Sequence, residues 1–379
     1  MNFNLTDEQK LIQKTAREFA ETELAPGVIE RDEKKIWPRE GIQKMGELGF
    51  MGMMVNPQYN GGGMDAVSYT IAMEEISRID ASSSVVMSVN NSLVCYLLES
   101  FGSDYIKEKY LTQLASGKKL GAFSLSEPQS GSDASNMKTI AVKDGDHYII
   151  NGTKNWVTNG INSDYVVIMA ITTQGIGHKG ISTFIVEKGW EGFAEGKPEN
   201  KLGIRASDTC ELYLDDVKIP EANLIGNEGD GFKIALSTLD GGRIGIAAQA
   251  LGIAQASLDA AVTYSKERVQ FGKPISSNQG IQFKLADMGM EIEAARLLVR
   301  KAAFMKDQHK NFGILASMAK VYASEVAMRA STDCVQIHGG YGYMREYGVE
   351  RLMRDAKITQ IYEGTSEIQR VVVSREILK

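Results

Sequence analysis

One carboxylate near the end of the chain stands where a proton-abstracting base could work. Glu363 lies between Tyr362 and Gly364, and a helical pattern begins shortly afterwards at Ser366. Gly364 can adopt a positive φ or let a ligand approach closely, and Ser366-x-x-Gln369 is typical of a capping box that starts the last helix. A carboxylate held just outside a helix N-terminus can face a cleft and accept a proton there. The alternative is an ordinary solvated loop charge, which is what most glutamates in loops are.

Two segments in the middle of the chain could contact a planar or anionic ligand. Residues 123–133 form a hydroxyl-rich stretch that indicates a turn, and backbone N–H groups in such a turn can bind an anion. In residues 154–160, Trp156 and Thr158 stand two apart and therefore share one face of a strand. An exposed Trp beside a hydroxyl could line a planar cofactor, whereas the commoner explanation of a strand Trp is core packing.

Three glycine-containing segments lie in the predicted C-terminal helical region, one early in it and two at helix ends, and metal or disulfide chemistry has little support. Residues 239–243, 267–272 and 336–342 can all be explained by capping and turn chemistry. His338 has no carboxylate or nucleophile at a partner spacing and is interpreted as structural. The three cysteines form no C-x-x-C and the four histidines no ligand spacing, so we expect no metal site and no disulfide framework.

The order of elements predicts an α+β fold with segregated domains. Helical periodicity covers about 6–116, nearly all strand-like runs lie between 121 and 222, and helical patterns return after 230. The predicted C-terminal helices are 231–267, 279–309, 312–337 and 366–377, and residues 81–100 are expected to form a buried helix. We expect domains at 1–120, 121–228 and 229–379. No G-x-G-x-x-G follows a strand and no P-loop is present, so a nucleotide would not be held in a Rossmann or P-loop cradle.

Composition narrows the class of protein. The 379 residues suit two or three domains, and 43% hydrophobic with 24% charged residues is ordinary for a globular chain. With a net charge of −6 and no Lys/Arg-rich run, nucleic-acid binding is not expected. No signal core, transit segment or unbroken run of 18 apolar residues is seen. We therefore expect no membrane span and a cytoplasmic protein, or one of the mitochondrial matrix if it is organellar.

In combination and in this order, these segments resemble the acyl-CoA dehydrogenase family along the whole chain. The resemblance runs from residues 5–9 to 363–370 and includes 126–133, 267–272 and 336–342. It implies an N-terminal helical domain, a middle β domain and a C-terminal four-helix bundle, with FAD extended between the β domain and the bundle. It also implies a homotetramer, a dimer of dimers, that binds acyl-CoA and passes electrons to electron-transfer flavoprotein.

The resemblance assigns roles to individual residues. It implies flavin-ring contacts at Phe123, Leu125, Ser126, Trp156 and Thr158, and FAD contacts at Thr365, Ser366 and Glu367. It implies contacts to the FAD pyrophosphate and adenosine, some across a subunit boundary, at Arg268, Phe271, Gln279, Gln336, Gly339 and Gly340. It implies acyl-CoA contacts at Ser132 (also placed in the cofactor set), Asp240, Arg243, Tyr362 and Gly364.

The same resemblance implies the reaction. Glu363 would remove the α-proton while flavin N5 takes the β-hydride. Isovaleryl- and long-chain-type members carry their base at the place of Gly242, which is a glycine here. Residues 88–93 and 239–247 are similar to short-chain, butyryl-CoA-type members, and 81–98 holds no Lys or Arg for a distal carboxylate. An apolar acyl chain should dry the pocket and raise the pKa of Glu363.

Three alternatives stay open at this point. The chain could act on another chain length or a branched substrate, or be an acyl-CoA oxidase, although oxidases are usually longer by a C-terminal domain. It could also be a non-catalytic flavin-binding module.

Overall fold

The computed structural model describes residues 4–379, and its first part is helical. Its elements before residue 81 are α1 (Asp7–Phe19), η1 (Ala20–Leu24), α2 (Val28–Lys34), α3 (Arg39–Glu47), η2 (Phe50–Gly52), η3 (Pro57–Tyr59) and α4 (Ala66–Ile79). Helix α1 begins at Thr6, whose hydroxyl accepts from Gln9 N while the Gln9 side chain accepts from Thr6 N. Thr6 and Gln9 therefore form a capping box.

A buried helical stretch runs from residue 81 to residue 101, as predicted. It consists of α5 (Ala81–Ser88), the π-helical turn η4 (Val89–Cys95) and α6 (Tyr96–Phe101), and is followed by α7 (Asp104–Ile106), η5 (Lys107–Leu111) and α8 (Thr112–Ala115). The wide turn η4 directs Asn90 and Asn91 into the interior. Asn90 donates to Met51 O (2.8 Å) and accepts from Gly121 N (2.9 Å), so η4 ties the helical domain to the first strand.

The strands form a mostly antiparallel sheet between residues 121 and 225. They are β1 (Gly121–Ser124), β2 (Ile140–Asp144), β3 (His147–Thr158), β4 (Tyr165–Ile171), β5 (Ile181–Glu187), β6 (Phe193–Glu195), β7 (Thr209–Pro220) and β8 (Leu224–Ile225), with 3-10 turns η6 (Gly177–Gly180) and η7 (Glu221–Asn223). The sheet order is β6-β7-β3-β2-β4-β5-β8, and β1 pairs parallel with β4. Strands β2 and β3 pair antiparallel and form a hairpin whose turn lies at residues 145–146.

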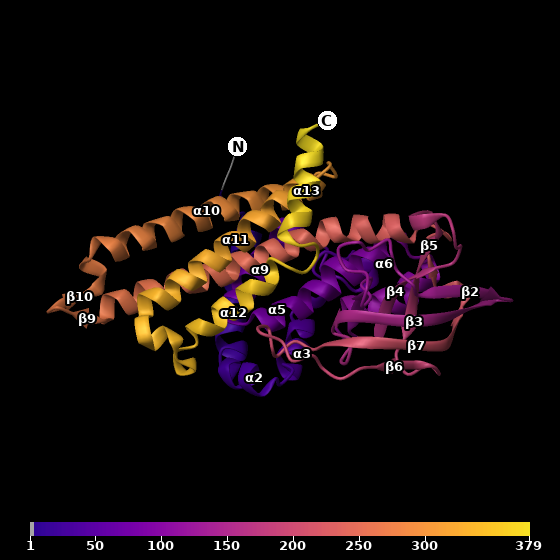
Figure 1. The fold of residues 1–379 in the computed structure, drawn as a ribbon, viewed down its shortest axis with the longest axis horizontal. Helices are drawn as coiled ribbons and strands as arrows, with labels where there is room; N and C mark the ends of the chain where they lie inside the picture. The colour runs from indigo at the N-terminus through magenta and orange to yellow at the C-terminus, as the bar shows by residue number, and fades with distance from the viewer. Residues whose placement is uncertain (1–3) are drawn as a thin grey trace.

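Long helices return at Gly231 and build a bundle beside the sheet (Figure 1). The elements are α9 (Gly231–Glu267), β9 (Val269–Gln270), β10 (Lys273–Pro274), η8 (Ile275–Ser277), α10 (Gln279–Asp307), α11 (Gly313–His338), η9 (Gly339–Tyr343), η10 (Arg345–Tyr347), α12 (Val349–Thr359) and α13 (Ser366–Ile377). The four predicted helices are found within about two residues of their expected ends. Sequence reasoning missed α12, which packs against α9 and α11.

Close backbone contact joins the N-terminal helices to the bundle. A Cβ at Gly252 in α9 would lie 2.4 Å from Glu74 O in α4, so only glycine fits there.

One hydrophobic cluster extends from Ile12 through Met169 to Ala356, and a second lies within the sheet around Phe184. The α+β architecture with helical, β and helical parts is confirmed. We keep 1–120, 121–228 and 229–379 as proposed domain boundaries.

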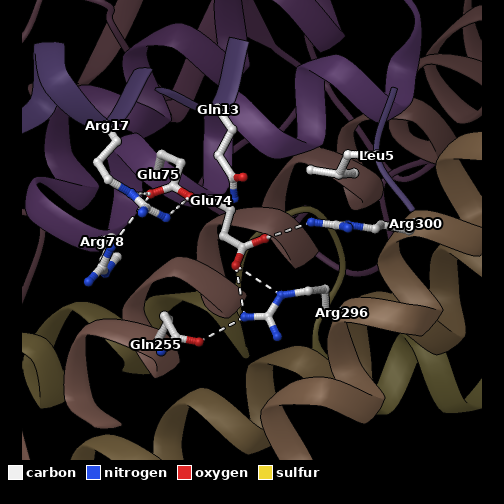
Figure 2. A pocket seen from close by; sticks show the side chains of 9 residues that line it. All are labelled: Leu5, Gln13, Arg17, Glu74, Glu75, Arg78, Gln255, Arg296 and Arg300. Carbon is white, nitrogen blue, oxygen red and sulfur yellow. Dashed lines mark hydrogen bonds and ion pairs between the residues drawn. The ribbon is translucent and has the colours of Figure 1, made fainter. Parts of the chain in front are cut away.

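Charged residues line a cavity of about 430 Å³ at the joint between α1, α4, α9 and α10 (Figure 2). Arg296 donates to Glu74 Oε1 at 2.9 Å, and Arg17 donates to Glu75 Oε1 at 2.7 Å. Both glutamates are buried, and each is paired with an arginine from another helix, Glu74 with α10 and Glu75 with α1. This cavity is a polar joint that fixes the N-terminal helices on the bundle.

Two helices satisfy a length-and-composition test for membrane spans, namely Ala81–Phe101 and Gly231–Glu267. Within the protein, 94% and 72% of their most apolar windows are buried. The apolar residues of both helices are packed in the core of the protein, so their length and composition are weak evidence for a membrane span.

Candidate active site

Glu363 lies on the short loop between α12 and α13, in a left-handed conformation. Its φ is 51°, and the φ of the following Gly364 is 91°. The Oε2 atom of Glu363 is fully shielded from solvent and has no hydrogen-bond partner within residues 4–379. The interpretation of Glu363 as a solvated loop charge is therefore wrong.

The cap of the last helix differs from the prediction. Thr365, not Ser366, is the N-cap, and its hydroxyl accepts from Ile368 N at 3.3 Å. Gln369 turns back to the loop, where its Nε2 donates to Glu363 O and to Gly364 O, each at 3.0 Å. The capping box expected at Ser366 and Gln369 is wrong, because the hydroxyl one residue earlier caps the helix and the amide side chain satisfies loop carbonyls.

The carboxylate of Glu363 packs against the bare backbone of α9. A Cβ at Gly242 would lie 2.0 Å from Glu363 Oε2 and 2.7 Å from Leu93 Cδ2. Glycine at position 242 is thus required by the carboxylate that comes from position 363. Leu93, in the π-helical turn η4, completes this face.

Burial dominates the electrostatics of the site. Desolvation raises the pKa of Glu363 to about 8, while the cations Lys320 and Arg243 partly oppose this rise. Arg243 donates to Asp240 Oδ1 at 2.5 Å and to Ser317 Oγ at 3.3 Å. The expected thioester-binding residues Asp240 and Arg243 are therefore an ion pair, and Arg243 lies close enough to influence Glu363.

The other residues of the loop surround the carboxylate. Tyr362 is half-buried, and its hydroxyl donates to Gln249 Oε1 on α9. Ser366 is buried with its Oγ unpartnered, and Glu367 is exposed in the first turn of α13. The structure thus brings together the predicted residues 362–367 and the α9 residues 240–243.

A bulge in β3 exposes Trp156. Its φ is 59°, the β3–β7 register shifts between Lys154 and Val157, and the side chain is 61% exposed. The interpretation that Trp156 packs in the core is therefore wrong. Val157 is buried and Thr158 is half-buried, so exposure alternates from Trp156 to Thr158 as the predicted shared face requires.

A buried ion pair fixes the hydroxyl-rich loop beside this bulge. Lys154 Nζ lies 2.9 Å from Glu127 Oε1 and 3.3 Å from Leu125 O, and Asn155 N donates to Ser126 O at 2.9 Å. Burial lowers the pKa of Lys154 to about 8. For Glu127, the Lys154 cation and hydrogen bonds outweigh burial and lower the pKa to about 2. Sequence reasoning missed this pair, whose signal was a lysine inside a strand-like run.

The remaining residues of the loop region lie near this pair or at its edge. Leu125 is buried, Phe123 and Ser126 are half-buried, and Ser132 is exposed at the tip. The predicted flavin contacts 123, 125, 126, 156 and 158 are therefore gathered on one part of the β domain.

A third set of predicted residues lies at the end of the bundle away from the sheet (Figure 1). Its members, at the ends of α9, α10 and α11, are Arg268, Phe271, Gln279, Gln336, Gly339 and Gly340. Arg268 is 26 residues beyond Gly242, about 39 Å along α9. Phe271 is 99% exposed with a φ of 52°. Within one chain, the structure does not bring this set to Glu363.

Three further observations concern His338, possible metal ligands and Lys320. His338 stacks on Tyr264 with ring centroids 4.1 Å apart, and its Nδ1 lies 2.8 Å from Cys334 O, which confirms a structural role. No group of three or more His, Cys, Asp or Glu side chains in residues 4–379 could hold a metal ion. Lys320 in α11 was missed, although its Nζ donates to Gly364 O at 2.7 Å. Its signal was a single lysine in a small-residue helical run.

The fold consists of a helical domain, a β domain and a helical bundle, and Glu363 packs against residues of the first and the last of these. The chain belongs to the acyl-CoA dehydrogenase family, because the family's N-terminal, middle and C-terminal domain models match residues 6–118, 122–217 and 229–378.

Close relatives share the whole length of the chain. It is 50% identical over 379 residues to the "Acyl-CoA dehydrogenase, short-chain specific" of Clostridium acetobutylicum, covering 100% of both chains. Butyryl-CoA dehydrogenase from Megasphaera elsdenii has a solved structure with a TM-score of 0.99 and 51% identity, with 100% of both chains covered. A chain in a structure described as "Electron transferring flavoprotein of Acidaminococcus fermentans: Towards a mechanism of flavin-based electron bifurcation" has a TM-score of 0.99, 52% identity and the same coverage.

Proposed function

We propose that this enzyme oxidises a short-chain, butyryl-CoA-like thioester to the trans-2-enoyl-CoA, with Glu363 as the base that removes the α-proton. The observation that carries the proposal is the shielded Glu363 carboxylate, which packs on Gly242 and has one oxygen without a partner. A carboxylate buried in this way at a loop is available to a ligand rather than committed to a structural contact.

The base strength of Glu363 suits the task. A thioester α-proton is weakly acidic, and a base works best when its pKa lies near the working pH. Burial raises the pKa of Glu363 to about 8, close to that optimum. General base catalysis of this kind contributes about 10²–10⁴-fold in rate.

The developing negative charge on the thioester carbonyl oxygen also needs a donor. The backbone N–H of Glu363 donates to no acceptor within residues 4–379. We assign it to that oxygen, where one such donor contributes on the order of 10²–10³ in rate. Carboxylate and N–H would then act on the same substrate from a single residue.

FAD is the cofactor of this proposal, and the chain's own residues fit it. Trp156 offers an exposed ring, and the fixed loop of residues 123–126 lies beside it. The N-terminus of α13, with Ser366 Oγ unpartnered, suits phosphate or hydroxyl groups. Bound FAD supplies the acceptor for the β-hydride.

The third residue set supports a shared cofactor site. Arg268 lies about 39 Å from Gly242 along α9, and Phe271 and Gln336 lie at the same end of the bundle, so we assign them to FAD held by a second copy of the chain. This arrangement agrees with a homotetramer, and the exposed Phe271 ring would be covered there.

Substrate class and partner come from the relatives. Two of them are named for short-chain or butyryl-CoA substrates. The structure named for an electron transferring flavoprotein contains a chain with a TM-score of 0.99, which supports such a flavoprotein as electron acceptor. Asp240 and Arg243 are proposed to bind the CoA portion, with Ser132, Tyr362 and Gly364 along the thioester.

Anaerobic reduction of the flavin tests the proposal. Thioesters from C3 to C8 are mixed with the enzyme, and bleaching of the flavin absorbance is followed for wild type and Glu363→Gln. We expect C4 to be among the fastest and Glu363→Gln to lose reduction while still binding thioester. Wild-type rates in the glutamine variant would exclude Glu363 as the base.

The alternatives give different results in the same system. An acyl-CoA oxidase would pass electrons rapidly to O₂, whereas a dehydrogenase should reoxidise slowly with O₂ and rapidly with electron-transfer flavoprotein. A fastest rate with another chain length or a branched thioester would reassign the substrate. A purified protein that takes up no FAD would indicate a non-catalytic module.

A further inference from the structure

We propose that Lys320 is a positioning residue for the base: its buried ammonium holds the Glu363–Gly364 turn and favours the ionised carboxylate. This inference rests on the proposed role of Glu363 as base. It adds a residue of α11 to a site that otherwise consists of α9, η4 and the loop before α13.

The ammonium of Lys320 has an unusual set of contacts. The side chain is fully buried, and its Nζ donates to Gly364 O at 2.7 Å. No carboxylate within residues 4–379 lies within 4.0 Å of it, so Lys320 forms no ion pair. Burying an unpaired charge is costly. Lys154, the other fully buried lysine among the large side chains, is paired with Glu127.

The backbone that Lys320 contacts is strained. Glu363 has a φ of 51°, a left-handed conformation that a non-glycine residue keeps only where its surroundings fix it. The carbonyl of Gly364 is bound by both Lys320 Nζ and Gln369 Nε2, and Gln369 also binds Glu363 O. Tyr362 is anchored separately on Gln249. Among these anchors, Lys320 alone carries a charge.

The charges around Glu363 make Lys320 its principal stabiliser. Glu363 is faced by Lys320 from α11, by Arg243 from α9 and by the Tyr69 hydroxyl from α4. Arg243 is already paired with Asp240, whereas Lys320 has no carboxylate of its own. The attraction of Lys320 opposes burial and holds the pKa of Glu363 below the value that burial alone would give.

The charges around Lys320 also favour its attraction to Glu363. Burial lowers the pKa of Lys320 to about 8, while Glu363, Glu325 and Glu367 raise it and Arg243 lowers it. Glu363 is the largest of the opposing influences. The cation and the carboxylate therefore favour each other's charged forms.

Lys320→Met in the FAD-containing enzyme tests the inference. The variant keeps the length and burial of the side chain but loses the charge and the donor. Single-turnover flavin reduction by butyryl-CoA is measured from pH 6 to 10. We expect the midpoint to rise by about one pH unit, with about tenfold slower reduction at pH 7 that recovers at high pH. A purely structural role would lower the rate equally at every pH.

A readout independent of turnover accompanies the rates. The carboxylic C=O stretch of Glu363, identified by its loss in Glu363→Gln, is titrated by infrared difference spectroscopy. We expect its protonated form to persist to higher pH in Lys320→Met. Lys320→Gln, which keeps a donor for Gly364 O without the charge, should show the same shift.

Lys306→Met is the matched control. Lys306 is also a buried lysine whose pKa burial lowers to about 8, but it packs over the Tyr96 ring at 4.7 Å and beside Met54. Its loss should leave the midpoint unchanged. An unshifted midpoint and infrared titration in both Lys320 variants would overturn the inference. If Lys320→Met does not fold, Lys320→Gln decides. Failure of Glu363→Gln to abolish reduction would refute the proposed function instead.

Discussion

The substitution Gly242→Ala should displace the Glu363 carboxylate without changing its chemical nature. The added Cβ would lie 2.0 Å from Glu363 Oε2, and ordinary contact begins at 3.4 Å. The carboxylate must therefore retreat by about 1.4 Å, since the helix backbone of α9 cannot yield easily. A misplacement of about 1 Å at a reacting group can cost about 10²-fold in rate. We expect flavin reduction by butyryl-CoA to slow by about that factor.

The neighbouring glycine supplies a control for this experiment. A Cβ at Gly241 would meet nothing closer than Lys306 Nζ at 3.5 Å and Ser92 O at 3.7 Å, so Gly241→Ala should reduce at nearly the wild-type rate. Both alanines should raise helix stability by roughly 0.5–1 kcal/mol relative to glycine, apart from the clash. Stopped-flow bleaching under anaerobic conditions and thermal unfolding measure the two effects. If Gly242→Ala reduces as fast as Gly241→Ala, Glu363 does not work from the position seen here.

Four further outcomes are expected. The rate of flavin reduction should rise between about pH 6 and 9, because a base whose pKa is raised to about 8 works only when ionised; a kcat/KM midpoint near the ordinary 4.5 would contradict this. Lys154→Met should lower the free energy of unfolding by about 3–5 kcal/mol in urea titrations, because Glu127 is left as an uncompensated buried charge. Trp156→Ala should change the unfolding free energy of FAD-free protein by no more than about 0.5 kcal/mol, yet weaken FAD binding in fluorescence titrations. Thr365→Ala should cost about 1 kcal/mol of stability through loss of the helix cap, and an unchanged Tm would contradict this.

The long elements could be predicted from the sequence because their patterns are regular. The bundle helices and the β2–β3 hairpin follow from apolar periodicity and turn residues. Helix α12 was not predicted because several of its charged residues form ion pairs inside the protein instead of facing solvent. Arg354 pairs with Asp32 at 2.7 Å, and Arg351 pairs with Asp355 at 3.1 Å. Its apolar residues Val349, Leu352 and Ala356 are buried at helical spacing, but the charged residues between them mask this pattern in the sequence.

The candidate site was predictable in its residues but not in its environment. The family resemblance singles out Glu363, yet its carboxylate packs on Gly242 and its loop is held by Lys320, both remote in sequence. No local pattern contains such contacts. Likewise, the sequence left open whether Trp156 is exposed or packed in the core, because the bulge that turns it outward depends on pairing with β7.

The continuous hydrophobic cluster has a consequence for how the protein unfolds. It joins Ile12 of the first helix, Met169 of the sheet and Ala356 near the end of the chain, so each sequence-defined part leaves apolar surface bare when cut away. We expect the parts not to behave as separable modules. Calorimetry should then record one cooperative endotherm, and a fragment ending at residue 120 should aggregate rather than fold.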